Sequence, residues 1–169
     1  MYIGIDLGGT NIAVGLVGDD GKLLKSVSTP TLSERDYTEI VNDMAKLVRG
    51  ILSITGHTID DIDGIGIGNP GTVDNENGII LYSNNLGWEN ANVREELNKY
   101  FDVPVNIEND ANAAAFGEYS LYADKIKDFV FVTLGTGVGG GIIIDGKIYR
   151  GFNGAGAELG HTTLVHDGV

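Results

Sequence analysis

Apolar and polar residues alternate along the first part of the chain in the pattern of β-strands. The alternation predicts strands over Tyr2–Leu7, Asn11–Gly18 and Lys22–Thr29. Short glycine-containing turns separate these strands, so we expect an antiparallel meander. The residues expected on the buried face of the middle strand are Ile12, Val14 and Leu16.

After Pro30 the apolar spacing changes to three and four residues, which predicts a long amphipathic helix from Tyr37 to Leu52. Ser33 to Asp36 supply a capping signal before this helix, and Gly56 supplies a stop after it. The later elements predicted are a strand at Ile65–Ile67, strands Thr72–Val73 and Ile79–Tyr82 flanking a turn at Asn75–Gly78, a helix at Asn92–Tyr100, a strand at Val105–Glu108 and an alanine-rich helix at Ala111–Tyr119. The order βββαβαβα predicts a mixed α/β sheet.

The strand–turn–strand pattern of the start occurs again near the end. Phe131–Gly137 leads through a glycine-rich turn into Gly139–Ile144 and an Asp-Gly turn. We therefore expect a first domain over residues 1–120 and the start of a second lobe of the same design over 121–169, too short to bury a core alone. Because glycine has no Cβ, backbone N–H groups in such turns can close around an anion, and two turns can grip one polyphosphate. The duplication predicts a nucleotide-handling enzyme.

Charge and composition narrow the partners. The chain has 11 Lys and Arg against 24 Asp and Glu, a net charge of −13, which repels nucleic acid and anionic membrane surfaces. A nucleotide has the same sign, so local N–H groups and a divalent cation, which we expect to be Mg²⁺, would have to hold it. The chain has no cysteine, which excludes disulfides and thiolate metal sites. With no targeting or membrane-spanning segment in the pattern, we expect a cytoplasmic protein.

Acidic and amide residues follow two of the predicted strands. Asp6 ends an apolar strand, where a carboxylate is costly unless it binds water, a metal or backbone N–H groups. Asn109 and Asp110 open the alanine-rich helix, and either could serve simply as its N-cap. A carboxylate fixed at a helix N-terminus also suits a base that accepts a hydroxyl proton in phosphoryl transfer.

Polar pairs mark two further segments. Glu158 and His161 are three apart among small residues, a spacing that would put both on one face of a helix. The adjacent Asn84 and Asn85 carry donors and acceptors that suit sugar hydroxyls, although a plain turn explains them equally well.

Taken together, these motifs resemble the bacterial and archaeal ROK sugar kinases, the group that contains many glucokinases. The motifs that carry the resemblance are Ile5–Thr10, Asn69–Gly71, Asn85–Trp88, Asn109–Ala113, Leu134–Gly141 and Gly154–His161. The resemblance implies the ribonuclease-H-like fold of the actin and hexokinase ATPases, with the active site between two lobes. It also implies ATP- and Mg²⁺-dependent phosphorylation of the primary hydroxyl of a hexose.

The resemblance implies a role for individual residues. Asp110 would be the catalytic base, and Asp6 would help to bind Mg²⁺. The residues implied to bind ATP are Asp6, Gly8, Gly9, Thr10, Asn11, Gly135, Thr136, Gly137, Val138, Gly139 and Gly140. The residues implied to contact the sugar are Gly71, Asn84, Asn85, Asn109, Asp110, Glu158 and His161.

Two features differ from the family pattern. The histidine that corresponds to His161 commonly joins a cysteine cluster that binds a structural zinc, and this chain has no cysteine. Much of the family's second lobe has no counterpart in the residues up to Val169, so we expect the front part of a kinase. We expect the full-length form to be a homodimer. Family repressors carry a DNA-binding segment before the kinase region, whereas Met1 directly precedes the first strand, which argues against that branch.

Alternatives to an active kinase stay open. A non-catalytic sugar-binding or regulatory module, or an inactive fragment, would carry the same motifs. The spacing of the motifs fits glucose, mannose, fructose or N-acetylmannosamine as acceptor, and ATP or polyphosphate as donor.

Overall fold

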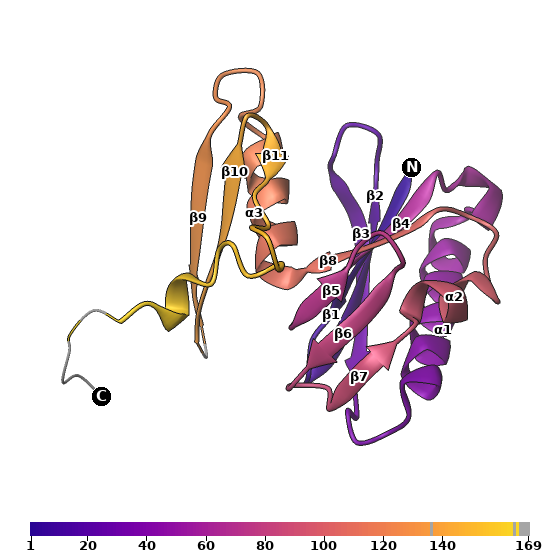
Figure 1. The fold of residues 1–169 in the computed structure, drawn as a ribbon. Helices are drawn as coiled ribbons and strands as arrows, with labels where there is room; N and C mark the ends of the chain where they lie inside the picture. Colours follow the sequence, from indigo (N-terminus) through magenta and orange to yellow (C-terminus); the bar gives the residue numbers. More distant parts are fainter. Residues whose placement is uncertain (136, 164, 166–169) are drawn as a thin grey trace. The chain divides into compact units, whose positions relative to one another are not determined.

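The computed structural model describes residues 1–135, 137–163 and 165. Contacts divide the chain into two compact units, residues 1–110 and 111–169 (Figure 1). The division after residue 120 that the sequence suggests stays a prediction. Within the described ranges, the structure contains no helix that is both long and apolar enough to cross a membrane.

The first unit is built on a mixed sheet with the strand order β3-β2-β1-β4-β8 (Figure 1). The first three strands form the predicted antiparallel meander, and β4 and β8 extend the sheet in parallel with β1. The bounds of these strands are Tyr2–Leu7 (β1), Asn11–Val17 (β2), Leu23–Pro30 (β3), Gly64–Asn69 (β4) and Val105–Asn109 (β8). The predicted alternation in β2 is confirmed, because its three apolar residues are fully buried: Ile12, Val14 and Leu16.

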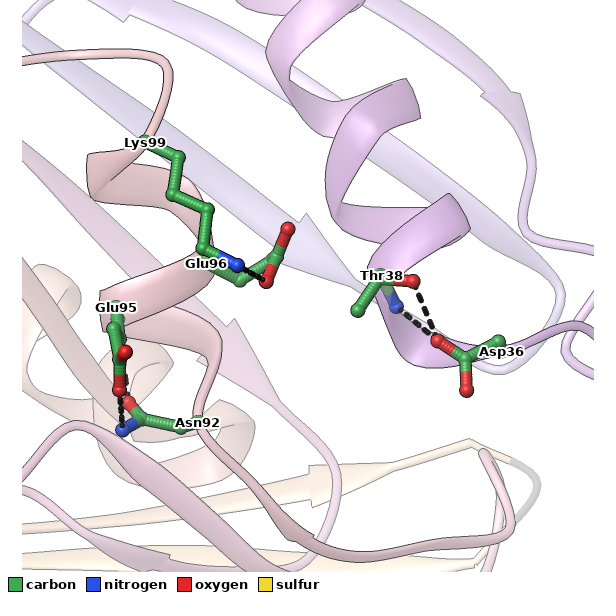
Figure 2. Close-up of polar contacts among 6 residues, drawn as sticks. All are labelled: Asp36, Thr38, Asn92, Glu95, Glu96 and Lys99. Atoms are coloured by element: carbon green, nitrogen blue, oxygen red, sulfur yellow. Dashed lines mark hydrogen bonds and ion pairs between the residues drawn. The ribbon is translucent and has the colours of Figure 1, made fainter.

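Two helices of the first unit begin at side-chain caps. Helix α1 (Tyr37–Thr55) starts at Asp36, whose carboxylate accepts from the backbone N–H of Thr38 at 2.9 Å, and ends at Gly56 in the left-handed conformation. Helix α2 (Val93–Asn98) starts at Asn92, whose side chain accepts from the N–H of Glu95 (Figure 2). The capping signal predicted before α1 and the stop predicted at Gly56 are therefore confirmed. Asp36 and Asn92 each accept from a backbone N–H that the first helical turn leaves open.

The core of the first unit lies between the main sheet and these helices. Helix α1 packs against β2, β3 and α2 (Figure 1). A small antiparallel sheet, of order β5-β6-β7, contacts β8 and α2. Its strands are Thr72–Asp74 (β5), Ile79–Ser83 (β6) and Trp88–Ala91 (β7). The sequence did not predict β7, whose Trp88 ring packs edge-on against Tyr37 at 5.9 Å between centroids.

The second unit repeats the opening meander. Strands β9 (Phe129–Leu134), β10 (Val138–Ile144) and β11 (Lys147–Ile148) pair antiparallel in the order β11-β10-β9, the counterpart of β3-β2-β1. Helix α3 (Asp110–Ser120) packs on β10, where a Cβ at Gly141 would lie 2.3 Å from the Cβ of Ala115. The duplicated strand topology expected from the sequence is therefore confirmed, and glycine in β10 permits the close helix contact.

Candidate active site

The predicted site residues of the first unit gather at one edge of the main sheet. β1, β4 and β8 are parallel, so their carboxyl ends meet at the same edge, where ligand crevices form in α/β sheets. Asp6 pairs with Gly68 of β4, and Gly68 pairs with Glu108 of β8. Asp110 lies two residues past Glu108, at the first position of α3. The topology thus brings together acids that are far apart in the sequence.

The electrostatic environment of Asp6 reflects this arrangement. Protein atoms around its carboxylate remove part of its hydration, which raises the pKa of Asp6, and the negative charge of Asp110 raises it further. The side chain stays accessible to solvent. A cation beside these carboxylates would offset their repulsion, which is the condition expected at a metal or phosphoryl-transfer site.

The turn between β1 and β2 is held in a defined conformation. The N–H of Gly8 donates to the carbonyl oxygen of Asn11 at 3.0 Å. The hydroxyl of Thr31 donates to the carbonyl oxygen of Gly8 at 2.6 Å, and the N–H of Thr31 donates to that of Thr10 at 2.8 Å. Thr31 is fully buried. Sequence reasoning missed Thr31, because a single threonine after a strand gives no signal of the turn it contacts.

Two glycines let the predicted sugar residues approach the same edge. A Cβ at Gly9 would lie 3.0 Å from the carbonyl oxygen of Asn85, so the Gly8–Thr10 turn lies directly against this segment. Gly71 has φ of +121°, and a Cβ there would lie 2.2 Å from the carbonyl oxygen of Tyr82. The side-chain amide of Asn109 donates to the carbonyl oxygen of Gly71 at 3.2 Å. These contacts link the β1–β2 turn, the segment after β6 and the end of β8 in one neighbourhood.

Buried polar atoms lie beside Gly71. Asn69 and Ser83 are fully buried, and the Oδ1 of Asn69 and the Oγ of Ser83 have no hydrogen-bond partner among the described residues. A Cβ at Gly71 would lie 2.9 Å from the Cα of Ser83. Each such atom costs about 1–3 kcal/mol unless water or a ligand supplies its partner. The sequence motif contained Asn69, but its burial could not be read from it.

The second glycine-rich turn belongs to the second unit. The N–H of Gly135 donates to the carbonyl oxygen of Gly137 at 2.9 Å. Thr136 lies outside the described residues, and Val138 is exposed. Protein atoms fill the space beside Gly139 and Gly140. A Cβ at Gly139 would lie 2.9 Å from the Cγ2 of Thr133, and one at Gly140 would lie 2.5 Å from the Cδ1 of Leu159. Packing therefore explains these two glycines, and their phosphate role stays a prediction.

Glu158 and His161 lie at a short helical turn, η2 (Leu159–His161), that packs on β10. The imidazole Nε2 of His161 lies 3.8 Å from a carboxylate oxygen of Glu158, and both side chains are exposed. The predicted shared face is therefore confirmed, although it is formed by one 3₁₀ turn and not by a longer helix. Within the part of the chain that the structure describes, no group of three or more His, Asp or Glu side chains could hold a metal. The expectation that His161 lacks the cysteine partners of the family's zinc site, and so does not bind zinc in this chain, stays a prediction.

A model of the ROK family matches residues 2–169. The chain belongs to the ROK family. The glucokinase of Thermotoga maritima is 42% identical over 168 residues, which are 98% of this chain and 51% of that protein. The xylose repressor of Caldicellulosiruptor bescii is 35% identical and aligns with 96% of this chain and 41% of that protein. Family membership alone therefore covers both kinases and regulators.

Solved ROK structures have the same fold. A ROK glucokinase from Streptomyces griseus, solved in complex with glucose and AMPPNP, superposes with a TM-score of 0.84 at 38% identity. The match covers 99% of this chain and 52% of that one. The expected fold of the actin and hexokinase ATPases is thereby confirmed. The chain spans about half the length of the curated glucokinases it matches.

Proposed function

We propose that this chain supplies the sugar-binding and catalytic part of an ATP- and Mg²⁺-dependent hexose kinase. One observation carries the proposal: Asp6, Asn109 and Asp110 meet at the carboxyl edge of the parallel strands, next to a glycine turn that Thr31 holds in place. The glucokinase relatives, one of them solved with glucose and AMPPNP, support a hexose as acceptor and ATP as donor. We also propose that the intact protein is cytoplasmic and a homodimer. Light scattering, which measures molar mass, would test the homodimer.

In the proposed reaction, Asp110 is the general base. Its carboxylate accepts the proton of the sugar's primary hydroxyl while that oxygen attacks the γ-phosphorus of ATP in line and ADP leaves. Asp110 is the first residue of α3, so the start of the helix positions its carboxylate at the carboxyl edge of the sheet. Asn109 and Gly71, which are hydrogen-bonded to each other, would orient the sugar together with Asn84 or Asn85.

Mg²⁺ fits the residues present. It is usually held by one or two carboxylates together with substrate phosphates, and Asp6, at the end of β1, offers one such carboxylate. When bound, the ion neutralises charge on the transferred phosphoryl group. The backbone N–H groups of Gly8–Thr10 and, in the second unit, of Gly135–Gly140 are proposed to bind the phosphates. Glu158 and His161 are proposed to complete the sugar contacts.

Calorimetry and a coupled ADP assay would test the function together. We expect the chain to bind a hexose and the intact protein to release ADP only when the hexose is present. Titration with glucose, mannose, fructose and N-acetylmannosamine would identify the acceptor, and polyphosphate in place of ATP would identify the donor. If the chain binds none of these sugars and the intact protein phosphorylates none of them, the proposal is wrong.

A second candidate is a non-catalytic sugar-binding or regulatory module. The similarity to xylose repressors over nearly the whole chain favours it. Hexose binding without turnover at saturating ATP and Mg²⁺ would support this module. Sugar-dependent ADP release would exclude it.

A further inference from the structure

β8 is an edge strand, and it leads directly to Asn109 and Asp110. It pairs with β4 on one side, so the outward-facing backbone groups of β8 need other partners. Side chains from the β5–β6 turn and from α2 supply them. The edge that carries the proposed sugar and base residues is therefore fixed by side chains and not by a neighbouring strand.

Arg94 of α2 ties this edge to the β5–β6 turn. Its Nε donates to the carbonyl oxygen of Val105 in β8 at 2.8 Å. Its Nη1 and Nη2 donate to the carbonyl oxygens of Glu76 and Asn75 at 2.6 and 2.7 Å. Gly78 permits the approach, because a Cβ there would lie 2.4 Å from the Cβ of Arg94. A planar guanidinium can make these divergent contacts at once, whereas a lysine ammonium cannot reproduce the fork.

Asn75 continues the connection to the site. Its side-chain amide donates to the carbonyl oxygen of Ile107 at 2.6 Å and to the Oε2 of Glu108 at 3.1 Å. The Oε1 of Glu108 accepts from the backbone N–H of Asn109 at 3.0 Å. Asn109 in turn donates to the carbonyl oxygen of Gly71. An unbroken series of hydrogen bonds thus runs from Arg94 to the residue proposed to contact the sugar.

We propose that Arg94, Asn75 and Glu108 are positioning residues that hold Asn109 in its sugar-binding orientation. This rests on the proposed hexose kinase function. All the contacts lie in the first unit, and none of the three residues is among those expected to touch sugar or ATP. Functional geometry commonly has to be held within about 0.5 Å, so a loosened strand end would weaken sugar binding more than ATP binding.

Variants that exchange hydrogen-bond donors for acceptors at Asn75 and Glu108 test the positioning role directly. Asn75→Asp removes the donors to β8 and places a carboxylate against Glu108, so hexose affinity should fall about tenfold, the effect of losing one hydrogen bond to a charged group. In the double variant with Glu108→Gln, the glutamine amide can donate to the new carboxylate while its oxygen still accepts from Asn109, so affinity should partly recover. Asn92→Asp is the matched control, because Asn92 also donates to a glutamate, Glu95, which is not part of the series that leads to Asn109 (Figure 2).

The readouts separate positioning from general destabilisation. We expect the sugar KM of Asn75→Asp to rise while its ATP KM stays within about twofold, and Arg94→Lys to behave likewise. A lower kcat with both KM values unchanged, or no recovery in the double variant, would overturn the proposal.

Backbone amide hydrogen exchange of Asn109 in the chain provides a readout that needs no activity. Its protection should fall in Asn75→Asp and return in the double variant with Glu108→Gln. If the wild-type protein neither binds nor phosphorylates a hexose, the proposed function fails. Unchanged protection of the Asn109 amide would instead refute the positioning network alone.

Discussion

Replacing Gly71 by alanine should both destabilise the first unit and impair sugar binding. Gly71 adopts φ of +121°, a conformation that residues with a Cβ rarely tolerate, and the new methyl would lie 2.2 Å from the carbonyl oxygen of Tyr82. Neither problem can be relieved by a side-chain rotation, because both involve backbone atoms, those of Gly71 itself and of Tyr82 in β6. The backbone must therefore move, and the hydrogen bond from Asn109 to Gly71 moves with it.

The loss of stability in Gly71→Ala has two contributions, backbone strain and steric overlap. Backbone strain at such a φ costs about 1–3 kcal/mol, and overpacking a filled site costs about 1–3 kcal/mol more. A total near 3 kcal/mol should lower the Tm of a unit of this size by at least about 10 °C. A displaced Asn109 should also weaken hexose binding by about tenfold or more.

Thermal unfolding by circular dichroism, with calorimetric titration of the sugar, measures both effects. Gly66→Ala is a matched control in β4, because its Cβ would meet no atom within 4 Å, so its stability should change by less than about 0.5 kcal/mol. If Gly71→Ala melts within about 2 °C of this control, the reasoning about the strained segment is wrong.

Three other variants test separate parts of the account. The pKa of Asp6 is raised in the folded protein, so its ionisation costs stability above the ordinary aspartate pKa of about 3.9. The Asp6→Asn variant should therefore have a higher Tm than the wild type at pH 7, and the difference should vanish near pH 3. Mg²⁺ should raise the Tm of the wild type only. A lower Tm of the variant at pH 7 would contradict the repulsion from Asp110. Thr31→Val removes the hydroxyl that holds Gly8, so urea unfolding should show a loss of about 1–2 kcal/mol and the ATP KM should rise; unchanged values for both would refute its role. Gly141→Ala pushes α3 away from β10, so the second unit should lose about 1–3 kcal/mol, seen as faster amide exchange in β9 and β10; native-like exchange would contradict the close packing.

Local signals in the sequence predicted much of the fold. The alternation in β1 to β3, the cap at Asp36 and the stop at Gly56 each depend on neighbours in the chain, and each is confirmed. The order of the elements predicted a mixed α/β sheet, and the structure shows that β4 and β8 are the strands parallel to β1. The position of Asp6 and Asp110 at one edge of the sheet follows from this pairing, which the sequence did not specify.

Contacts between distant segments could not be predicted in the same way. β7 lacks a clear alternation, and it exists because it pairs with β6. The bonds from Arg94 to Val105 and from Thr31 to Gly8 join residues whose types give no hint of their partners. Two of the glycines expected to bind phosphate in the second unit, Gly139 and Gly140, also have a packing role that only the structure reveals.

The most direct test of the proposed mechanism is turnover by Asp110→Asn. The asparagine keeps the shape of the side chain but cannot accept the hydroxyl proton, so sugar-dependent ADP release by the intact protein should fall by about 10²–10⁴-fold while hexose affinity changes little. Asp102→Asn, in the loop that enters β8 at its other end, should retain full activity. Wild-type turnover by Asp110→Asn would contradict the assignment of Asp110 as the base.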